Sequence, residues 1–79
     1  MTPTSLDIIK AIAEHLALSP EDLDRDALLQ EDLGLGPIEL NDLLTTLSQK
    51  FNITFEAAEV ENLHKIEDLI SLVEDNLLD

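Results

Sequence analysis

The sequence predicts an all-α domain, a bundle of four helices in which the third is short and a long loop joins the first two. Three observations predict this class. Apolar residues recur at steps of three and four positions in three separate segments, which places them on one helix face each time. Prolines and glycines stand between the first two of those segments, where helices end or begin. The one segment with strand-like alternation, residues 51–55, has no convincing second strand to pair with it.

The first helix is expected over about residues 4–18, with one apolar face turned to the core. The dipeptide Ser19-Pro20 is expected to end it, because proline disfavours the helical conformation in the residue before it. The predicted buried face consists of Leu6, Ile9, Ile12, Ala13 and Leu16.

Residues 20–36 are expected to form an ordered loop, although six acidic residues stand there against Arg25 alone. The segment has no Ser/Gly-rich or repetitive stretch, which argues against disorder. Regularly placed leucines are expected to pack inward and hold the loop on the bundle. These leucines are Leu23, Leu28, Leu29, Leu33 and Leu35.

The second helix has a clear start signal. Pro37 suits the first helical position, where its missing N–H would have no partner anyway, and Gly36 can serve as the cap. We expect one face of this helix to be buried and the opposite face to be offered to partners. The apolar stripe is Leu40, Leu43, Leu44, Leu47 and Phe51, and the polar face is Glu39, Asn41, Asp42, Thr45, Ser48 and Gln49.

Two further helices complete the expected bundle. Because a lone strand cannot satisfy its backbone polar groups, residues 51–55 are not expected to form a sheet. A short helix is expected around residues 56–61, and a last helix over about residues 66–77. The residues in register on the last helix are Ile66, Leu69, Ile70, Val73 and Leu77.

Composition narrows the classes of partner. The chain has 79 residues with 18 acidic and 4 basic side chains, so its formal charge is −14. That charge repels nucleic acid and anionic membrane surfaces and favours a basic protein surface as partner, although the acidic residues can also serve solubility alone. No apolar run approaches the roughly 20 residues that span a bilayer, and no cationic leader is evident. We expect one soluble, cytoplasmic, monomeric domain over residues 1–79.

The order of these elements and the segment EDLGLGPIEL, residues 31–40, resemble the acyl and peptidyl carrier proteins. In this comparison, EDLG matches the family's Asp-Leu-Gly turn, and Gly36-Pro37-Ile38 stands in the place of its Asp-Ser-Leu signature. The resemblance runs from end to end without a gap and implies a four-helix bundle of the acyl-carrier type. Downstream residues at the family's core spacings are Phe51, Phe55, Leu63, Ile66 and Ile70.

The resemblance implies that the attachment serine is absent. In the family, a transferase joins phosphopantetheine from coenzyme A to that serine, whereas Pro37 has no nucleophile and Gly36 lacks the preceding carboxylate. None of the chain's serines or threonines stands directly after the Asp-Leu-Gly turn, at the helix start, so no phosphopantetheine and no other cofactor is expected. The fold can survive this change because proline is a good residue for a helix start.

The resemblance also implies docking to enzymes or assembly proteins that carry basic patches. The residues expected to contact such partners are Glu31, Asp32, Ile38, Glu39 and Asp42. Farther along the second helix, the family's usual acids are replaced by Ser48 and Gln49, followed by Lys50. This departure indicates either a dedicated partner or a weakened contact, and the alternative is that the acidic residues form only a solvated face.

Other chemistry is not expected. Asp22, Asp24 and Asp26 resemble the opening of a calcium loop, but Ala27 and Leu33 stand where its glycine and bidentate glutamate belong. No metal site is therefore expected. His15 and His64 have no third ligand at metal spacing and are interpreted as surface residues. A bundle this small has little room for a pocket that separates catalytic carboxylates, so the protein is not expected to be an enzyme.

A cavity that shelters an acyl chain is a further implication of the resemblance, although aliphatic residues at helical spacing more often form ordinary core. We expect a noncovalent interaction or regulatory module in a fatty-acid, polyketide or nonribosomal-peptide type of pathway. The alternative is a working carrier with atypical attachment or with noncovalent acyl-chain binding. The expected cavity lining is Leu40, Leu44, Leu47, Phe55, Leu63 and Ile66.

Overall fold

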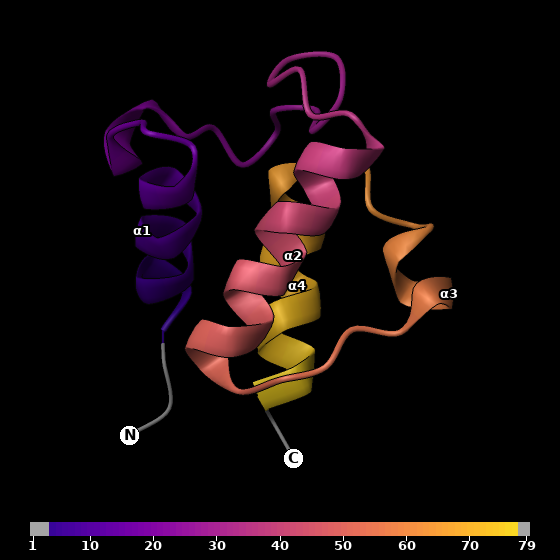
Figure 1. Cartoon of the computed structure of the whole chain (residues 1–79). Coiled ribbons are helices and arrows are strands. Elements are labelled where there is room, and N and C mark those ends of the chain that lie inside the picture. Colours follow the sequence, from indigo (N-terminus) through magenta and orange to yellow (C-terminus); the bar gives the residue numbers. More distant parts are fainter. Residues whose placement is uncertain (1–3, 78–79) are drawn as a thin grey trace.

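Helix α1 packs against both α2 and α4 in the computed structural model, which describes residues 4–77. Figure 1 shows α2 lying across α4, with α1 on one side of this pair and the short α3 on the other. The core draws on α1, α2, α4 and the long loop, so the all-α bundle predicted from the sequence is confirmed. The elements are α1 (Ser5–His15), a 3₁₀ turn η1 (Pro20–Asp22), α2 (Pro37–Phe51), α3 (Ala57–Val60) and α4 (Ile66–Leu77).

Helix α1 ends earlier than the expected residue 18. Ala17 adopts a left-handed conformation with φ of 59°. The N–H of Leu18 donates to the carbonyl of Ala13 at 2.9 Å, and the N–H of Ala17 donates to that of Glu14 at 3.2 Å. These two bonds form the Schellman motif that closes many helices. Ser19-Pro20 therefore lies beyond a helix that has already stopped.

Replacing Ala17 with glycine is expected to raise the free energy of unfolding by about 1 kcal/mol, because the left-handed conformation is strained for alanine and free for glycine. Chemical denaturation followed by circular dichroism measures this change. The control is Ala58→Gly inside α3, where glycine is expected to destabilise by about 0.5 to 1 kcal/mol. A loss of stability in Ala17→Gly would contradict the strain at that position.

The buried face of α1 also differs from the expected one. Ile12 lies at its centre, Ile8 and Ala11 are buried beside it, and Leu6 is 55% exposed. The reason is that α1 contacts two helices, so its buried face is wider than one stripe and is displaced away from Leu6. Ile9 and Leu16 are half-buried at the edge of the core.

The loop between α1 and α2 is ordered and packs leucines inward, as predicted. Leu23, Leu29 and Leu35 are buried. Backbone bonds fasten the loop to the segment before α4, because Leu29 N–H donates to the carbonyl of His64 at 2.8 Å. Within residues 4–77, the only strand-like pairing is an isolated bridge between Leu28 and Lys65, so the rejection of a sheet is confirmed.

Helix α2 begins as predicted, with Gly36 as extended N-cap and Pro37 at the first helical position. It ends at Asn52, whose φ of 55° is left-handed. The next residue, Ile53, is buried, and its carbonyl accepts a hydrogen bond from the hydroxyl of Ser48. Ser48, expected on the partner-facing surface, therefore closes the end of its own helix. Helix α4 has the predicted bounds, and α3 is one residue shorter at each end than expected.

The carboxylate of Asp68 caps the start of α4. It accepts hydrogen bonds from the backbone N–H groups of Lys65 at 3.0 Å and His64 at 3.1 Å. The bond from Lys65 is the main reason that the pKa of Asp68 lies below its ordinary value of 3.8. Since the folded pKa is lowered, the carboxylate stabilises the fold above pH 3.8, and that contribution disappears as pH falls through the folded pKa.

The difference in free energy of unfolding between Asp68→Asn and the unsubstituted protein is therefore expected to shrink as the pH falls. The substitution should cost under about 1 kcal/mol near pH 7, because Asp68 is partly exposed and solvent weakens its hydrogen bonds. The difference should shrink progressively as the pH falls below 3.8. Urea denaturation from pH 7 to pH 2.5 measures both curves, and parallel curves over that range would contradict the capping role.

Candidate functional site

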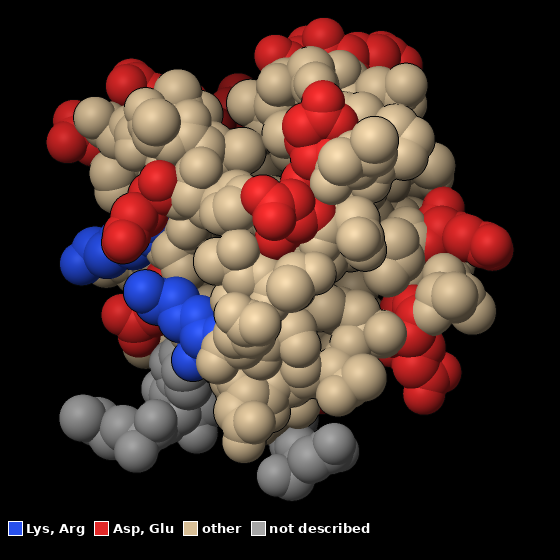
Figure 2. Space-filling model, in the orientation of Figure 1, with Lys and Arg blue, Asp and Glu red and all other residues tan. Residues whose placement is uncertain are grey.

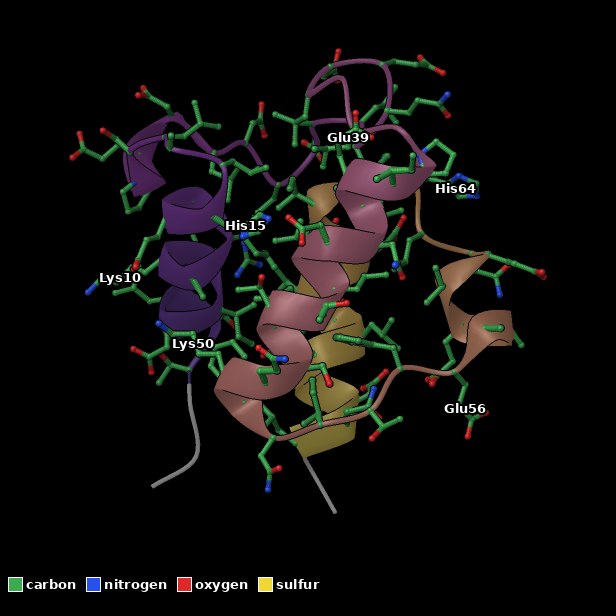
Figure 3. All side chains as sticks on the ribbon, viewed as in Figure 1. Lys10, His15, Glu39, Lys50, Glu56 and His64 are labelled. Atoms are coloured by element: carbon green, nitrogen blue, oxygen red, sulfur yellow. The ribbon has the colours of Figure 1, made fainter. Side chains whose placement is uncertain are left out.

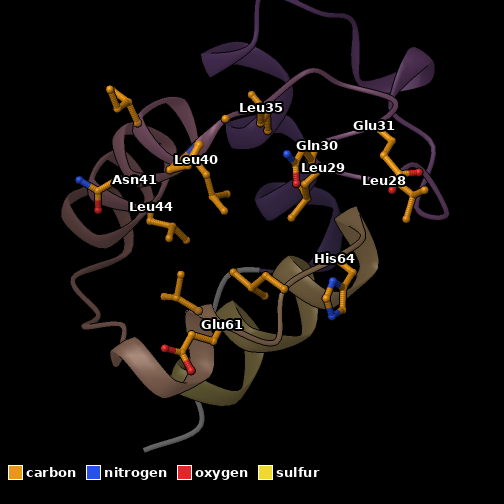
Figure 4. Close-up of a pocket in the computed structure, with 15 residues that line it drawn as sticks. Leu28, Leu29, Gln30, Glu31, Leu35, Leu40, Asn41, Leu44, Glu61 and His64 are labelled. Carbon is orange, nitrogen blue, oxygen red and sulfur yellow. The ribbon is translucent and has the colours of Figure 1, made fainter.

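A hollow lies beside the start of α2, enclosed by the long loop, α2 and the segment from α3 to α4 (Figure 4). We call it the first hollow, and its volume is about 780 Å³. Gly36, Pro37 and Ile38 border it. Its apolar lining is Leu28, Leu29, Leu35, Leu40, Leu44, Val60 and Leu63, and its polar lining is Gln30, Glu31, Asn41, Glu61 and His64.

A second hollow of about 630 Å³ continues the first along α2. It lies between α2 and the segment that carries α3, and it reaches Ser48 and Thr54. The two hollows therefore form one groove from the start of α2 toward its end. They share Asn41, Leu44, Val60 and Glu61.

The structure brings together part of the predicted cavity lining. Three of the six predicted residues line the first hollow, and Phe55 lines the second. Leu47 and Ile66 are fully buried in the core and line neither hollow. The three in the first hollow are Leu40, Leu44 and Leu63.

Sequence reasoning missed the wall that the long loop supplies, which is Leu28, Leu29 and Leu35. The available signal was their inward-packing pattern, which placed them in the core without indicating a hollow. Val60 of α3 was also missed as part of the lining.

Hydroxyl groups are absent from the described residues that line the first hollow. Pro37 occupies the first position of α2 there and has neither a hydroxyl nor an N–H. In the second hollow, the hydroxyl of Thr45 donates to the carbonyl of Asn41 at 2.9 Å, and that of Ser48 donates to Ile53. Two of the hydroxyls along this groove therefore already donate hydrogen bonds to backbone carbonyls of the chain.

Three of the five residues expected to contact partners lie in the first two turns of α2, namely Ile38, Glu39 and Asp42, and Glu31 borders the same hollow as Ile38. Ile38 is 82% exposed, more than any other large apolar residue of the described chain. Figure 2 shows acidic side chains over the long loop and the upper part of α2, and Lys10 and Lys50, labelled in Figure 3, lie toward the opposite end. Acidic side chains therefore lie over the start of α2, the helix that also carries the exposed Ile38.

Three of the predicted docking acids also make contacts within the chain. One oxygen of Asp32 accepts the N–H of Leu28 at 2.8 Å, which holds the loop. Asp42 lies 3.3 Å from Nε2 of His15. Glu39 bends back over the helix start, because its Oε2 lies 3.0 Å from the place a Cβ on Gly36 would occupy.

The two histidines differ from one another. His15, interpreted as a surface residue, has a side chain that is only 22% exposed and that contacts Asp42, so it connects α1 to α2 at the edge of the core. His64 is exposed, and it stands at the edge of the first hollow.

The described residues contain no group of three potential metal ligands. In the segment that resembles a calcium loop, the carboxylate of Asp24 accepts the N–H of Asp26 at 2.9 Å. None of the helices within residues 4–77 has the length and apolar character needed to cross a membrane.

The chain is similar in sequence to known proteins of one family. A family model described as a phosphopantetheine attachment site matches residues 7–73. The acyl carrier protein of Exiguobacterium sibiricum is 35% identical over 69 residues, covering 87% of each chain. The acyl carrier protein of Wolinella succinogenes is 30% identical over 70 residues, covering 89% of this chain and 92% of the relative. That of Chlamydia trachomatis serovar L2 is 30% identical over 70 residues, covering 89% and 91%.

Proposed function

The chain belongs to the acyl carrier protein family, and on that premise we propose that it works without a phosphopantetheine arm, as a noncovalent interaction or regulatory module. The observation that carries the proposal is Pro37 at the first position of α2, beside a hollow whose described lining has no hydroxyl. Covalent attachment of the arm needs a hydroxyl nucleophile, and the residues at this helix start do not fit that group. The rigid φ of proline nevertheless suits the helix start, so the change is compatible with the fold.

The proposed docking surface is the acidic end of α2 with the adjoining loop. Ile38 offers an exposed apolar side chain, and negative charge is supplied by Glu39 and Asp42 on the same helix and by Glu31, which borders the same hollow. Such a surface favours a partner with a hydrophobic contact point inside a basic patch, since opposite charges raise encounter rates and fix orientation. Suitable partners are the enzymes or assembly proteins of a fatty-acid, polyketide or nonribosomal-peptide type of pathway. The protein would compete with true carriers there or regulate such an enzyme, as a cytoplasmic monomer.

Incubation with coenzyme A and a broad-specificity phosphopantetheinyl transferase tests the proposal. The intact mass is expected to stay unchanged while a conventional acyl carrier protein in the same tube gains one arm. A mass increase of one arm on this chain would overturn the proposal, and peptide mapping would then identify the modified residue.

Noncovalent binding of an acyl chain is a second candidate function, and the first hollow is the observation that favours it. Its volume of about 780 Å³ lies within the range of small-molecule sites, and leucines supply most of its apolar lining. Native mass spectrometry of protein isolated from its own host tests this function. A bound lipid supports it, and a clean mass of the protein alone contradicts it.

A further inference from the structure

The first hollow combines an apolar interior with an acidic edge. In Figure 4, the side chains of Leu29, Leu40 and Leu44 point into the space, while Glu31 and Glu61 lie at its border. Both residues are exposed, so their carboxylates are accessible to a ligand. No lysine or arginine stands among the described residues of the lining, and His64 is its only basic side chain.

The start of α2 is the one other feature that would attract an anion. A helix N-terminus carries partial positive charge on its free N–H groups. Here Pro37 lacks one of those groups, and the carboxylate of Glu39 already lies over Gly36. The chain's own carboxylate therefore offsets this partial charge, and the mouth of the first hollow presents net negative charge to a ligand.

Resting on the second function proposed above, we infer that the first hollow selects a single-chain amphiphile with a cationic head group and disfavours a free fatty-acid anion. The alkyl chain lies among the leucines of the loop and α2, where burial of apolar surface drives binding. The head group lies at the border, where Glu31 and Glu61 supply the negative charge on opposite sides of the hollow. A carboxylate head group at that border meets like charge and no described lysine or arginine.

A matched series of 12-carbon ligands tests this selection: dodecylammonium, dodecanol and dodecanoate, each titrated below its micelle concentration at one pH and low salt. Isothermal titration calorimetry is expected to give one ligand per chain, with dodecylammonium about tenfold tighter than dodecanoate and dodecanol between them. Amide chemical shifts are expected to move at Leu40, Leu44 and Leu63. Equal affinity, or tighter binding of dodecanoate, would overturn the charge selection while leaving the acyl-binding function in place. If none of the three binds, both the selection and that function fail.

Two double variants distinguish the effect of the border carboxylates on ligand preference from the effect of the net charge of −14. The double variant Glu31→Gln/Glu61→Gln is expected to reduce the preference for dodecylammonium over dodecanoate at least threefold. The control, Glu14→Gln/Glu67→Gln, changes the net charge equally at exposed residues that line neither hollow, and its preference should shift less than twofold. Equal shifts in the two double variants would mean that the whole surface attracts the cation, which overturns the inference. His64→Gln is expected to increase the preference or leave it unchanged.

Discussion

Leu47→Ala is expected to lower the free energy of unfolding by about 2 to 5 kcal/mol. The side chain is fully buried in α2 and lines neither hollow, so its removal leaves a closed cavity in the packed core. A domain of this length has a total stability of only about 4 to 12 kcal/mol. The variant should therefore lose a large part of its stability, which thermal and urea denaturation followed by circular dichroism will measure.

Leu6→Ala is the matched control for that substitution. It makes the same chemical change on a helix, but the side chain of Leu6 is 55% exposed. The expected effect is within about 0.5 kcal/mol of zero. If Leu47→Ala were as mild as Leu6→Ala, Leu47 would border an open cavity, as the resemblance to carrier proteins led us to expect, instead of lying in closed core.

The sequence predicted best the helix ends that carry a specific local signal. Pro37 and Gly36 mark the start of α2 because their backbone preferences belong to a helix start wherever they occur. The end of α1 was predicted too late, since its left-handed closing residue is Ala17 and alanine is itself a good helix former. The face of α1 was displaced for a different reason. Periodicity finds an apolar stripe, but contact with two neighbouring helices decides how wide the buried face becomes.

The candidate site likewise has one part that local sequence predicted and another part that it did not. The residues around Pro37 were predicted because they are contiguous in the sequence. The loop wall of the hollow was not predicted, because its position depends on bonds between distant segments, such as Leu29 N–H to the carbonyl of His64. The contact between His15 and Asp42 depends likewise on how α1 crosses α2. Local patterns contain no information about such contacts.

Restoring the attachment signature is expected to have the largest functional effect. The double variant Gly36→Asp/Pro37→Ser should change the protein from one that accepts no arm to one that accepts one arm per chain. The backbone permits both residues, since Gly36 has an extended conformation with φ of −78° that aspartate adopts freely. Intact mass after incubation with coenzyme A and the transferase measures the result, with Gly36→Asp/Pro37→Ala as the matched control that lacks only the hydroxyl.

The fold should tolerate this change, because its local effects oppose one another. A Cβ at position 36 would lie 3.0 Å from Oε2 of Glu39, but that atom ends a flexible side chain that can turn outward. The new aspartate can then cap the helix, worth about 1 kcal/mol, while loss of Pro37 costs about 0.4 to 1 kcal/mol through the unfolded chain. A folded double variant that still refuses the arm would show that transferase recognition has diverged elsewhere, and the first positions to restore would then be the exposed Gln49 and Lys50. Ser48 comes after them, because its hydroxyl closes α2 and a larger acidic side chain there would cost stability as well as alter the surface.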